Sequence, residues 1–244
     1  GLIGCWFIVR LPESPRWSGT RGIGPATESP LREVLRPPLL SRTILGITLG
    51  AIPVVGSAAN ANWLVPWTDQ AVAERAEAEG SAAKLQKPDM RAKSLTQITR
   101  SGGAIFGSLL GGIIASILGR RWSYFLISLG AFAVSSYIFS QLDPLHPYFQ
   151  LWTFALGFIG IAYFGWLPLF LPELFPTRVR STGTGISFNT GRVVAGIVVL
   201  SAGFLLDRFG GNYARVGLAT GMIYVAGMVV IWFVPRKSFG KLDD

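Results

Sequence analysis

Apolar residues gather in six long runs along the chain, and each run is long enough to cross a bilayer. A hydrocarbon core of roughly 30 Å requires about 20 apolar residues in a helix. The runs lie near residues 44–67, 98–118, 123–141, 148–171, 182–206 and 215–234. They are continuous, whereas the strands of a membrane barrel are short and alternating. The pattern therefore predicts an all-α membrane protein with a six-helix transmembrane bundle over 44–234.

The segments before the first run predict a helix end and a linker. Residues 1–11 begin with nine apolar residues, lack an initiating Met and lack the basic and small-residue parts of a signal peptide. We therefore expect them to be the end of a truncated transmembrane helix, and the chain to be part of a longer protein. Residues 12–43 are rich in Pro, Arg, Ser and Gly and predict a cytoplasmic linker with a short surface helix at Pro30–Leu35.

Two polar segments remain outside the predicted spans. Residues 69–97 are expected to form the longest external loop, with one helix outside the membrane over Ala71–Lys84. Residues 235–244 are expected to be a cytoplasmic tail.

Composition supports a membrane protein and limits the function classes. Half of the chain is hydrophobic and only 14% is charged, against about 25% in soluble domains. The net charge of +9 reflects basic residues in short turns, at Arg120, Arg121, Arg178 and Arg180, which the positive-inside rule assigns to the cytoplasm. Both ends of the chain then face the cytoplasm, and no nucleic-acid motif accompanies the charge.

The sequence lacks the residue groupings of an enzyme or a metalloprotein. One cysteine, Cys5, cannot form an intrachain disulfide or a metal cluster, and the single histidine, His146, lies in a predicted surface loop. No Ser/His/Asp or Cys/His grouping is present. We therefore expect that the protein is not an enzyme and that it binds neither a metal nor a cofactor.

Glycine and proline spacing predicts two features of the bundle. Gly103, Gly107 and Gly111 recur every four residues, which favours close helix packing. The first span carries Pro53 between Gly50 and Gly56, and such residues are tolerated where neighbours or a cavity satisfy the backbone. We therefore expect a kinked or locally unwound helix beside a cavity.

Arg192 is the strongest candidate for substrate contact. It follows the start of its apolar run by about ten residues, or roughly 15 Å at 1.5 Å per residue, where a charge is expensive and usually marks a substrate or ion pathway. Asn189 lies one turn before it, so amide and guanidinium share a face on which they could hold a carboxylate. The alternative is a structural arginine that binds backbone carbonyls or an acid from another helix.

Other polar and aromatic residues are expected to line a cavity. In the first span, Asn60 and Trp63 share a face, and Asn62 lies between them. The alternative is an interhelical hydrogen bond with an interfacial tryptophan belt. In the fourth span, Tyr163 and Trp166 lie among glycines that thin the helix around them.

Charged residues at helix ends predict a gating network on one face of the membrane. The residues are Glu13, Arg16, Gly119, Arg120, Arg121, Glu173, Arg178 and Arg180. Carboxylates and guanidinium groups at such positions can hold one conformation closed. The alternative is that they only obey the positive-inside rule.

Three motifs resemble the C-terminal half of a major facilitator superfamily transporter. PESPRW at 12–17 resembles the end of the sixth helix in the sugar-porter and metabolite–proton symporter branches. ILGRRW at 117–122 resembles the loop between the eighth and ninth helices. PELFPTRVRSTGTGISFNTGR at 172–192 resembles the turn and eleventh helix of the branch that carries carboxylates and sialic acid with protons.

The resemblance implies a twelve-helix fold in which two six-helix bundles rock around a central cavity. It carries the family's gating network onto Glu13, Arg16, Arg120, Arg121, Glu173 and Arg180. Ser116 stands where the loop motif has an acid, which implies a weaker lock.

Together these features predict a proton-coupled symporter of a small organic anion or sugar acid, in the bacterial inner membrane. Its partners would be the substrate, the lipid bilayer and an N-terminal six-helix bundle missing from this sequence. No span interior carries an acid, so the proton site is expected in that missing bundle. The alternatives are a neutral sugar or drug transporter and a non-transporting membrane sensor or scaffold.

Overall fold

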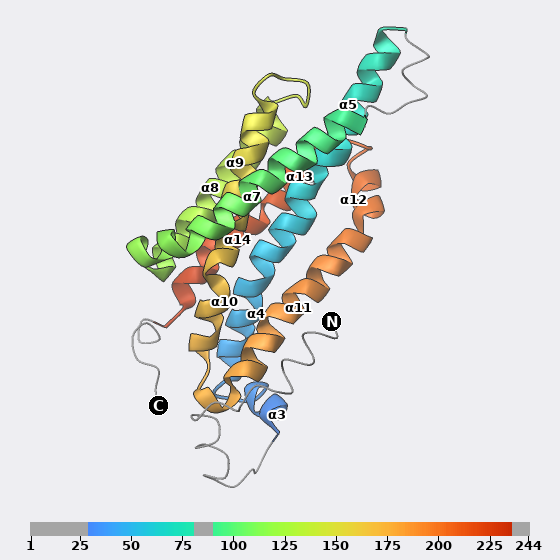
Figure 1. The fold of residues 1–244 in the computed structure, drawn as a ribbon. Coiled ribbons are helices and arrows are strands. Elements are labelled where there is room, and N and C mark those ends of the chain that lie inside the picture. Colours follow the sequence, from blue (N-terminus) through green and yellow to red (C-terminus); the bar gives the residue numbers. More distant parts are fainter. Residues whose placement is uncertain (1–28, 81–89, 236–244) are drawn as a thin grey trace, which may run out of the picture.

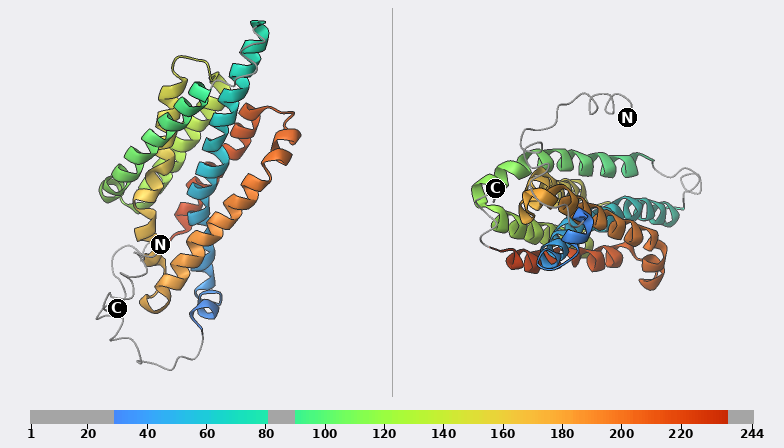
Figure 2. Two further views of the ribbon diagram at one scale, coloured as in Figure 1. Left: turned by 45° about the vertical axis from the view of Figure 1, so that its right-hand side comes forward. Right: turned by 90° about the horizontal axis from the view of Figure 1, so that it is seen from below.

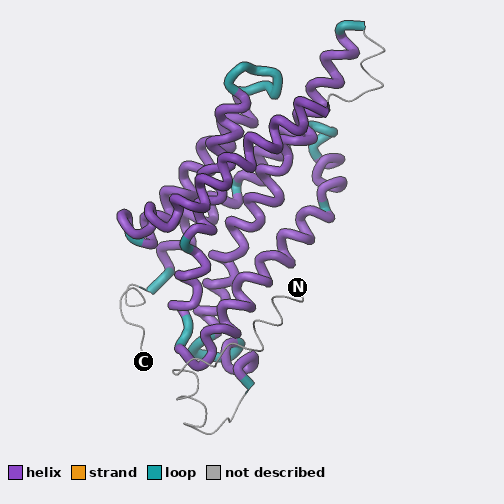
Figure 3. Tube along the Cα trace, viewed as in Figure 1, coloured by secondary structure: helices purple, strands orange, loops and turns teal. Residues whose placement is uncertain are grey.

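The computed structural model describes residues 29–80 and 90–235, and these residues form helices joined by loops (Figures 1 and 3). Six helical segments are long and apolar enough to span a membrane: Leu40–Ala78, Arg91–Leu118, Arg120–Gln141, Phe149–Leu174, Thr177–Leu200 and Tyr213–Phe233. The predicted all-α bundle of six spans is therefore confirmed. The helix end expected at residues 1–11 lies outside the described residues.

Most spans contain more than one helix. The α-helices are α3 (Pro30–Val34), α4 (Leu40–Val55), α5 (Leu64–Ala78), α7 (Met90–Leu118), α8 (Arg120–Gln141), α9 (Phe149–Ile161), α10 (Leu167–Phe170), α11 (Arg180–Leu200), α12 (Ala202–Arg208), α13 (Tyr213–Gly221) and α14 (Ile223–Val230). The short helices are the π-helix η1 (Gly56–Asn60) and the 3₁₀ turns η2 (Ala61–Trp63), η3 (Ala162–Gly165), η4 (Leu171–Leu174), η5 (Thr177–Val179) and η6 (Ile231–Phe233).

The short surface helix predicted near Pro30–Leu35 is present as α3. Its N-cap is Ser29, whose side chain accepts a hydrogen bond from the backbone N–H of Arg32 at 3.3 Å, and Pro30 occupies the first helical position. Both features are typical helix starts.

The first span extends further than its apolar residues predicted. We expected the span to end near residue 67 and a separate helix to follow, but α5 continues to Ala78 as part of one helical path from Leu40 (Figure 1). Pro66 does not end it, because Pro66 lies in the first turn of α5, where its missing N–H is harmless. The Ala- and Glu-rich sequence that follows consists of strong helix formers.

Helices α7 and α9 pack together through the glycines that the sequence singled out. A Cβ atom on Gly103, Gly107 or Gly111 would collide with the backbone carbonyl oxygens of Phe154, Phe158 and Ala162, respectively. The glycine face therefore lets the two backbones approach to a distance that any side chain would prevent, as predicted.

Helices α4 and α11 also approach closely. A Cβ atom on Gly50 would lie 3.0 Å from the carbonyl oxygen of Ser187, and one on Gly191 would lie 2.8 Å from the Cα atom of Ala51. This contact fixes the height of Arg192 on α11 beside Ala51 on α4, and Figure 2 shows the two helices side by side.

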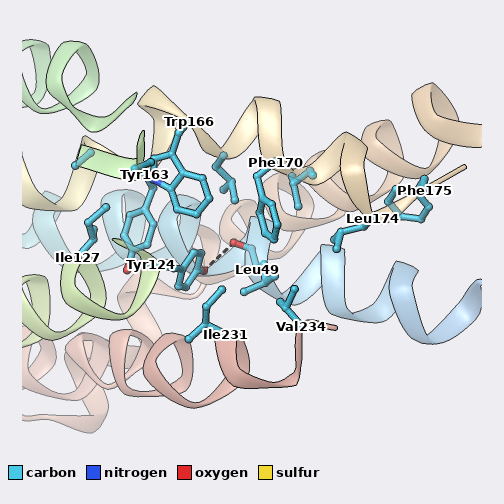
Figure 4. Packing of buried hydrophobic residues seen from close by; sticks show 14 of the residues in the cluster. Leu49, Tyr124, Ile127, Tyr163, Trp166, Phe170, Leu174, Phe175, Ile231 and Val234 are labelled. Atoms are coloured by element: carbon cyan, nitrogen blue, oxygen red, sulfur yellow. Dashed lines mark hydrogen bonds between the residues drawn. The ribbon is translucent and has the colours of Figure 1, made fainter. Parts of the chain in front are cut away.

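An aromatic core joins α4, α8 and the broken fourth span (Figure 4). The Tyr124 hydroxyl donates to the carbonyl oxygen of Leu49 at 2.9 Å, and its ring lies 4.8 Å from the Tyr163 ring, centroid to centroid. Buried hydroxyls of this kind require a partner. These contacts fix the helices that carry the candidate site residues.

Candidate functional site

Arg192 lies on the surface of the bundle, twelve residues into α11. Its Cζ atom is 5.0 Å from the centroid of the Phe188 ring, which lies one turn earlier. In the described part of the chain no hydrogen bond or ion pair reaches this guanidinium. The geometry therefore leaves the donors of Arg192 available to a ligand, and its role in binding stays a prediction.

Asn189 is exposed on the same side of α11. Its Nδ2 atom donates to the carbonyl oxygen of Gly185 at 2.9 Å, a bond within its own helix. Because the Asn189 side chain is exposed, its Oδ1 atom and its second N–H are accessible. Its cooperation with Arg192 stays a prediction.

Asn60 is buried where η1 ends, and it connects three helices. Its Nδ2 atom donates to the carbonyl oxygen of Gly217 at 2.7 Å, and its Oδ1 atom accepts from the Ser135 hydroxyl at 2.9 Å. Both ends of the amide therefore have protein partners. This arrangement favours the interhelical hydrogen bond that the sequence left open as the alternative to substrate contact.

Asn62 and Trp63 differ in their surroundings. Asn62 is exposed and donates from Nδ2 to the carbonyl oxygen of Ala58 at 3.0 Å. The Trp63 ring lies 5.7 Å from the Tyr213 ring, and its indole Nε1 is buried without a hydrogen-bond partner. The two residues therefore face different neighbours, although they are adjacent in sequence.

Tyr163 and Trp166 belong to the aromatic core of the bundle (Figure 4). The Tyr163 hydroxyl is 2.7 Å from the Ser128 hydroxyl, and the Trp166 ring packs against Phe170 with 5.5 Å between ring centroids. Both are almost completely buried. In this conformation they contact protein on all sides, so their contact with substrate stays a prediction.

A cavity of about 280 Å³ lies where the first span is broken. Its walls come from the first, second, fourth and last spans: Ser57, Ala58, Ala61, Asn62, Arg100, Ser101, Ala104, Leu156, Gly157, Gly160, Ile161 and Tyr224. The π-helix and 3₁₀ turn of the first span supply four of these residues, and π-bulges inside α-helices occur frequently at functional sites. The irregular backbone agrees with the unwound helix beside a cavity that the sequence predicted.

Arg100 is the charged residue of this cavity, and sequence reasoning missed it. The second apolar run is predicted to begin near residue 98, two residues before Arg100, but α7 begins at Met90, ten residues before it. Arg100 therefore lies inside a spanning helix, although the ten residues that precede it are mostly polar. The error came from the boundary, because the Arg91–Leu118 span starts in a polar sequence.

The helix ends carry the ion pairs of the predicted gating network. Glu173 pairs with Arg120, so the fourth and third spans are joined. Arg178 pairs with Glu33 on α3, a carboxylate that the sequence analysis did not include. Glu13 and Arg16 lie outside the described residues.

The remaining members of the network bind backbone. Arg121 donates to the carbonyl oxygen of Val234, and Arg180 donates from Nε to that of Phe175 at 3.4 Å. Gly119, at φ 74°, precedes α8 and forms the turn after α7. Only glycine adopts that backbone angle without strain. Whether these contacts gate the protein stays a prediction.

Comparisons with known proteins identify relatives among transporters. Residues 148–243 match the family described as "Sugar (and other) transporter". The chain is 31% identical over 137 residues to the cis,cis-muconate transport protein of Acinetobacter baylyi, covering 55% of this chain and 32% of that protein. It is 27% identical over 165 residues to a probable 4-methylmuconolactone transporter of Cupriavidus pinatubonensis, covering 67% and 36%.

A longer match reaches almost the whole chain. The chain is 24% identical over 264 residues to a putative metabolite transport protein of Bacillus subtilis, covering 98% of this chain and 56% of that protein. The chain thus spans about a third to just over half the length of these relatives. No solved structure matches it.

The family match, the relatives and the six membrane spans lead to one assignment. The matched family and relatives are transporters and not enzymes, and the spans make this chain an integral membrane protein. The chain is similar to transporters of the major facilitator superfamily, and its six spanning helices are consistent with the C-terminal half of that fold.

Proposed function

We propose that this chain is the C-terminal bundle of a secondary active transporter that moves a small organic anion or sugar acid together with protons. The observation that carries the proposal is Arg192, a guanidinium inside a membrane span without an ion-pair partner among the described residues. A charge at that depth is costly wherever it faces lipid. The face of α11 that bears Arg192 therefore faces an aqueous pathway between this bundle and a second, N-terminal one.

Relatives support an anionic substrate. The names of two of them specify cis,cis-muconate and 4-methylmuconolactone, and a niacin transporter of Acinetobacter baylyi is 30% identical over 116 residues. Muconate and niacin are carboxylic acids. A guanidinium with free donors binds such groups in bidentate geometry.

The other predicted residues take unequal parts in the proposal. Asn189 would assist Arg192, and Asn62 would line the pathway, since both side chains are exposed. Asn60, Trp63, Tyr163 and Trp166 would form the wall behind it and fix its shape through their packing.

Coupling to protons would reside outside the described spans of this chain. No acidic residue lines the described cavity, and Asp69 at the end of the first span pairs with Lys93 at 3.3 Å. We therefore place the proton-carrying group in the N-terminal bundle. The transporter would lie in a bacterial inner membrane with both ends of this chain in the cytoplasm, as the arginines of the short turns favour.

Proteoliposome uptake by the complete transporter tests the proposal. The panel contains radiolabelled cis,cis-muconate, nicotinate, lactate, sialate and glucose, each with and without an inward proton gradient. Gradient-driven uptake of an acid is expected. Uptake of glucose without uptake of any acid would contradict the proposal and favour the neutral-sugar alternative, which the name of the matched family also permits.

A further inference from the structure

We propose that the cavity beside the break in the first span is a second anion site, in which Arg100 binds a carboxylate of the transported acid. The proposal rests on the proposed function for the identity of the ligand. It adds a residue and a binding site that lie at a different height in the bundle from Arg192.

The cavity lies beside the part of the first span where the α-helical hydrogen-bond pattern changes. Residues Gly56–Asn60 form a π-helix, and a 3₁₀ turn follows over Ala61–Trp63. Tyr224 of α14 fills the space beside Gly56, since a Cβ atom there would lie 2.6 Å from its ring. The Tyr224 hydroxyl is thereby brought to the wall of the cavity, between the first and fourth spans.

The position of Arg100 is fixed by its own backbone. A Cβ atom on Gly157 would collide with the carbonyl oxygen of Arg100, so α7 and α9 are in direct backbone contact at this level. The side chain extends from this contact into the cavity wall. The site is therefore built into the most closely packed helix pair of the bundle.

The Arg100 side chain is partly buried, and its guanidinium is incompletely hydrogen-bonded. Its Nη2 atom donates to Oε1 of Gln97 at 3.2 Å, but its Nε atom is buried without any hydrogen-bond partner. A buried charge that lacks a partner is strongly unfavourable, and in proteins it is paired with an opposite charge. The structure thus leaves a cationic donor at this site that an anionic acceptor would satisfy.

A carboxylate is an acceptor of this kind. None of the described residues that line the cavity is acidic, so the protein itself supplies no counter-ion there. Tyr224 and Ser101 add hydroxyl donors to the same walls. The volume of about 280 Å³ is close to the lower end of the roughly 300–1,000 Å³ of small-molecule sites, so it suits a small acid.

The Arg100 site is separate from Arg192. Gly191, the neighbour of Arg192 on α11, packs against Ala51 of the first span. The first residue of that span to line the cavity is Ser57, six residues after Ala51. Six residues correspond to about 9 Å along a helix at roughly 1.5 Å per residue. The two cations therefore offer an acid two successive binding sites along one pathway.

Equilibrium binding of radiolabelled cis,cis-muconate to the complete transporter in nanodiscs tests the inference. We expect Arg100→Gln to raise the Kd about tenfold or more, the size typical of a hydrogen bond to a charged group, and Arg100→Lys to raise it less. Arg208→Gln, which removes an exposed guanidinium at the end of α12, is the matched control and should leave the Kd unchanged.

A second variant guards against loss of folding. Ala104→Leu keeps Arg100 and fills the cavity, so it should also weaken binding while the thermal midpoint stays near that of the wild type. If the wild type binds muconate, Arg192→Gln weakens it, and both Arg100→Gln and Ala104→Leu leave the Kd unchanged, the second site is refuted and the proposed function stands. If the wild type neither binds nor transports any acid of the panel, the proposed function fails and the second site fails with it.

Discussion

Two arginines at the helix ends and two inside the spans have different surroundings. At the helix ends, Arg120 forms an ion pair with Glu173, and Arg178 forms one with Glu33. Inside the spans, Arg192 contacts an aromatic ring and Arg100 binds one amide oxygen, and neither has a carboxylate partner among the described residues. The same residue type thus occurs paired with a carboxylate at the helix ends and without one inside the spans.

Under the proposed function, this difference separates structural charges from charges that bind the substrate. Ion pairs at helix ends contribute little to stability individually, but they can favour one arrangement of the helices. An unpaired guanidinium inside a span has no comparable structural benefit, and such residues mark pathways. We therefore expect substitutions inside the spans to change affinity and substitutions at the ends to change rates.

The largest effect is expected from Arg192→Gln. The variant removes a charged donor pair from the pathway, and a hydrogen bond to a charged group contributes about 1.5–3 kcal/mol, so the KM for acid uptake should rise about tenfold to hundredfold. Initial rates of gradient-driven uptake in proteoliposomes measure it. Arg192→Lys should recover part of the affinity, and an unchanged KM in Arg192→Gln would place Arg192 with the structural arginines.

Gly157→Ala tests how much the close backbone contact between Gly157 and Arg100 contributes to stability. The new Cβ would collide with the backbone of Arg100, and overpacking of this kind costs about 1–3 kcal/mol. The thermal midpoint in detergent should fall by several degrees. Gly196→Ala on α11 is the control, because a Cβ there meets nothing within 4 Å, and it should be neutral or stabilising.

Neutralising Glu173 should change transport rate more than affinity. Glu173→Gln breaks the ion pair with Arg120. Both side chains are partly buried, with 36% of the Arg120 side chain and 20% of the Glu173 side chain exposed. An effect of about 1 kcal/mol, near the upper limit for exposed pairs, corresponds to a severalfold change in the maximal uptake rate. The charge-reversed pair Arg120→Glu with Glu173→Arg should restore part of that rate, whereas a change confined to KM would contradict a gating role.

The smallest effect is expected from Arg178→Gln. The Arg178 side chain is 74% exposed, and exposed ion pairs contribute about 0–1 kcal/mol. Uptake should change less than about fivefold, and raising the salt concentration should reduce the difference from wild type. A loss of uptake as large as that of Arg192→Gln would remove the distinction between the two groups of arginines.

Features that depend on one helix at a time were predictable from the sequence. The six spans, the short helix α3 and the packing role of Gly103, Gly107 and Gly111 follow from periodicity, capping and spacing. The end of the first span was not predictable, because hydropathy falls at the membrane surface while helix propensity continues to Ala78.

Features that depend on contacts between helices were out of reach. Asn60 binds Gly217 and Ser135, which are 157 and 75 residues away, and no spacing rule along one helix relates them. The pairing of Arg178 with Glu33 joins residues 145 apart. Arg100 differs, because placing the start of α7 at Met90 would have put it inside a spanning helix.

The most direct test of the central claim is competition between an acid and its uncharged counterpart in proteoliposomes. Uptake of radiolabelled cis,cis-muconate would be measured against unlabelled muconate and muconic diamide, in the complete wild-type transporter and in Arg100→Gln with Arg192→Gln. The account predicts that the wild type prefers the acid at least tenfold and that the double variant loses this preference. Equal competition by acid and diamide in the wild type would contradict the claim that unpaired arginines inside the spans read the charge of the substrate.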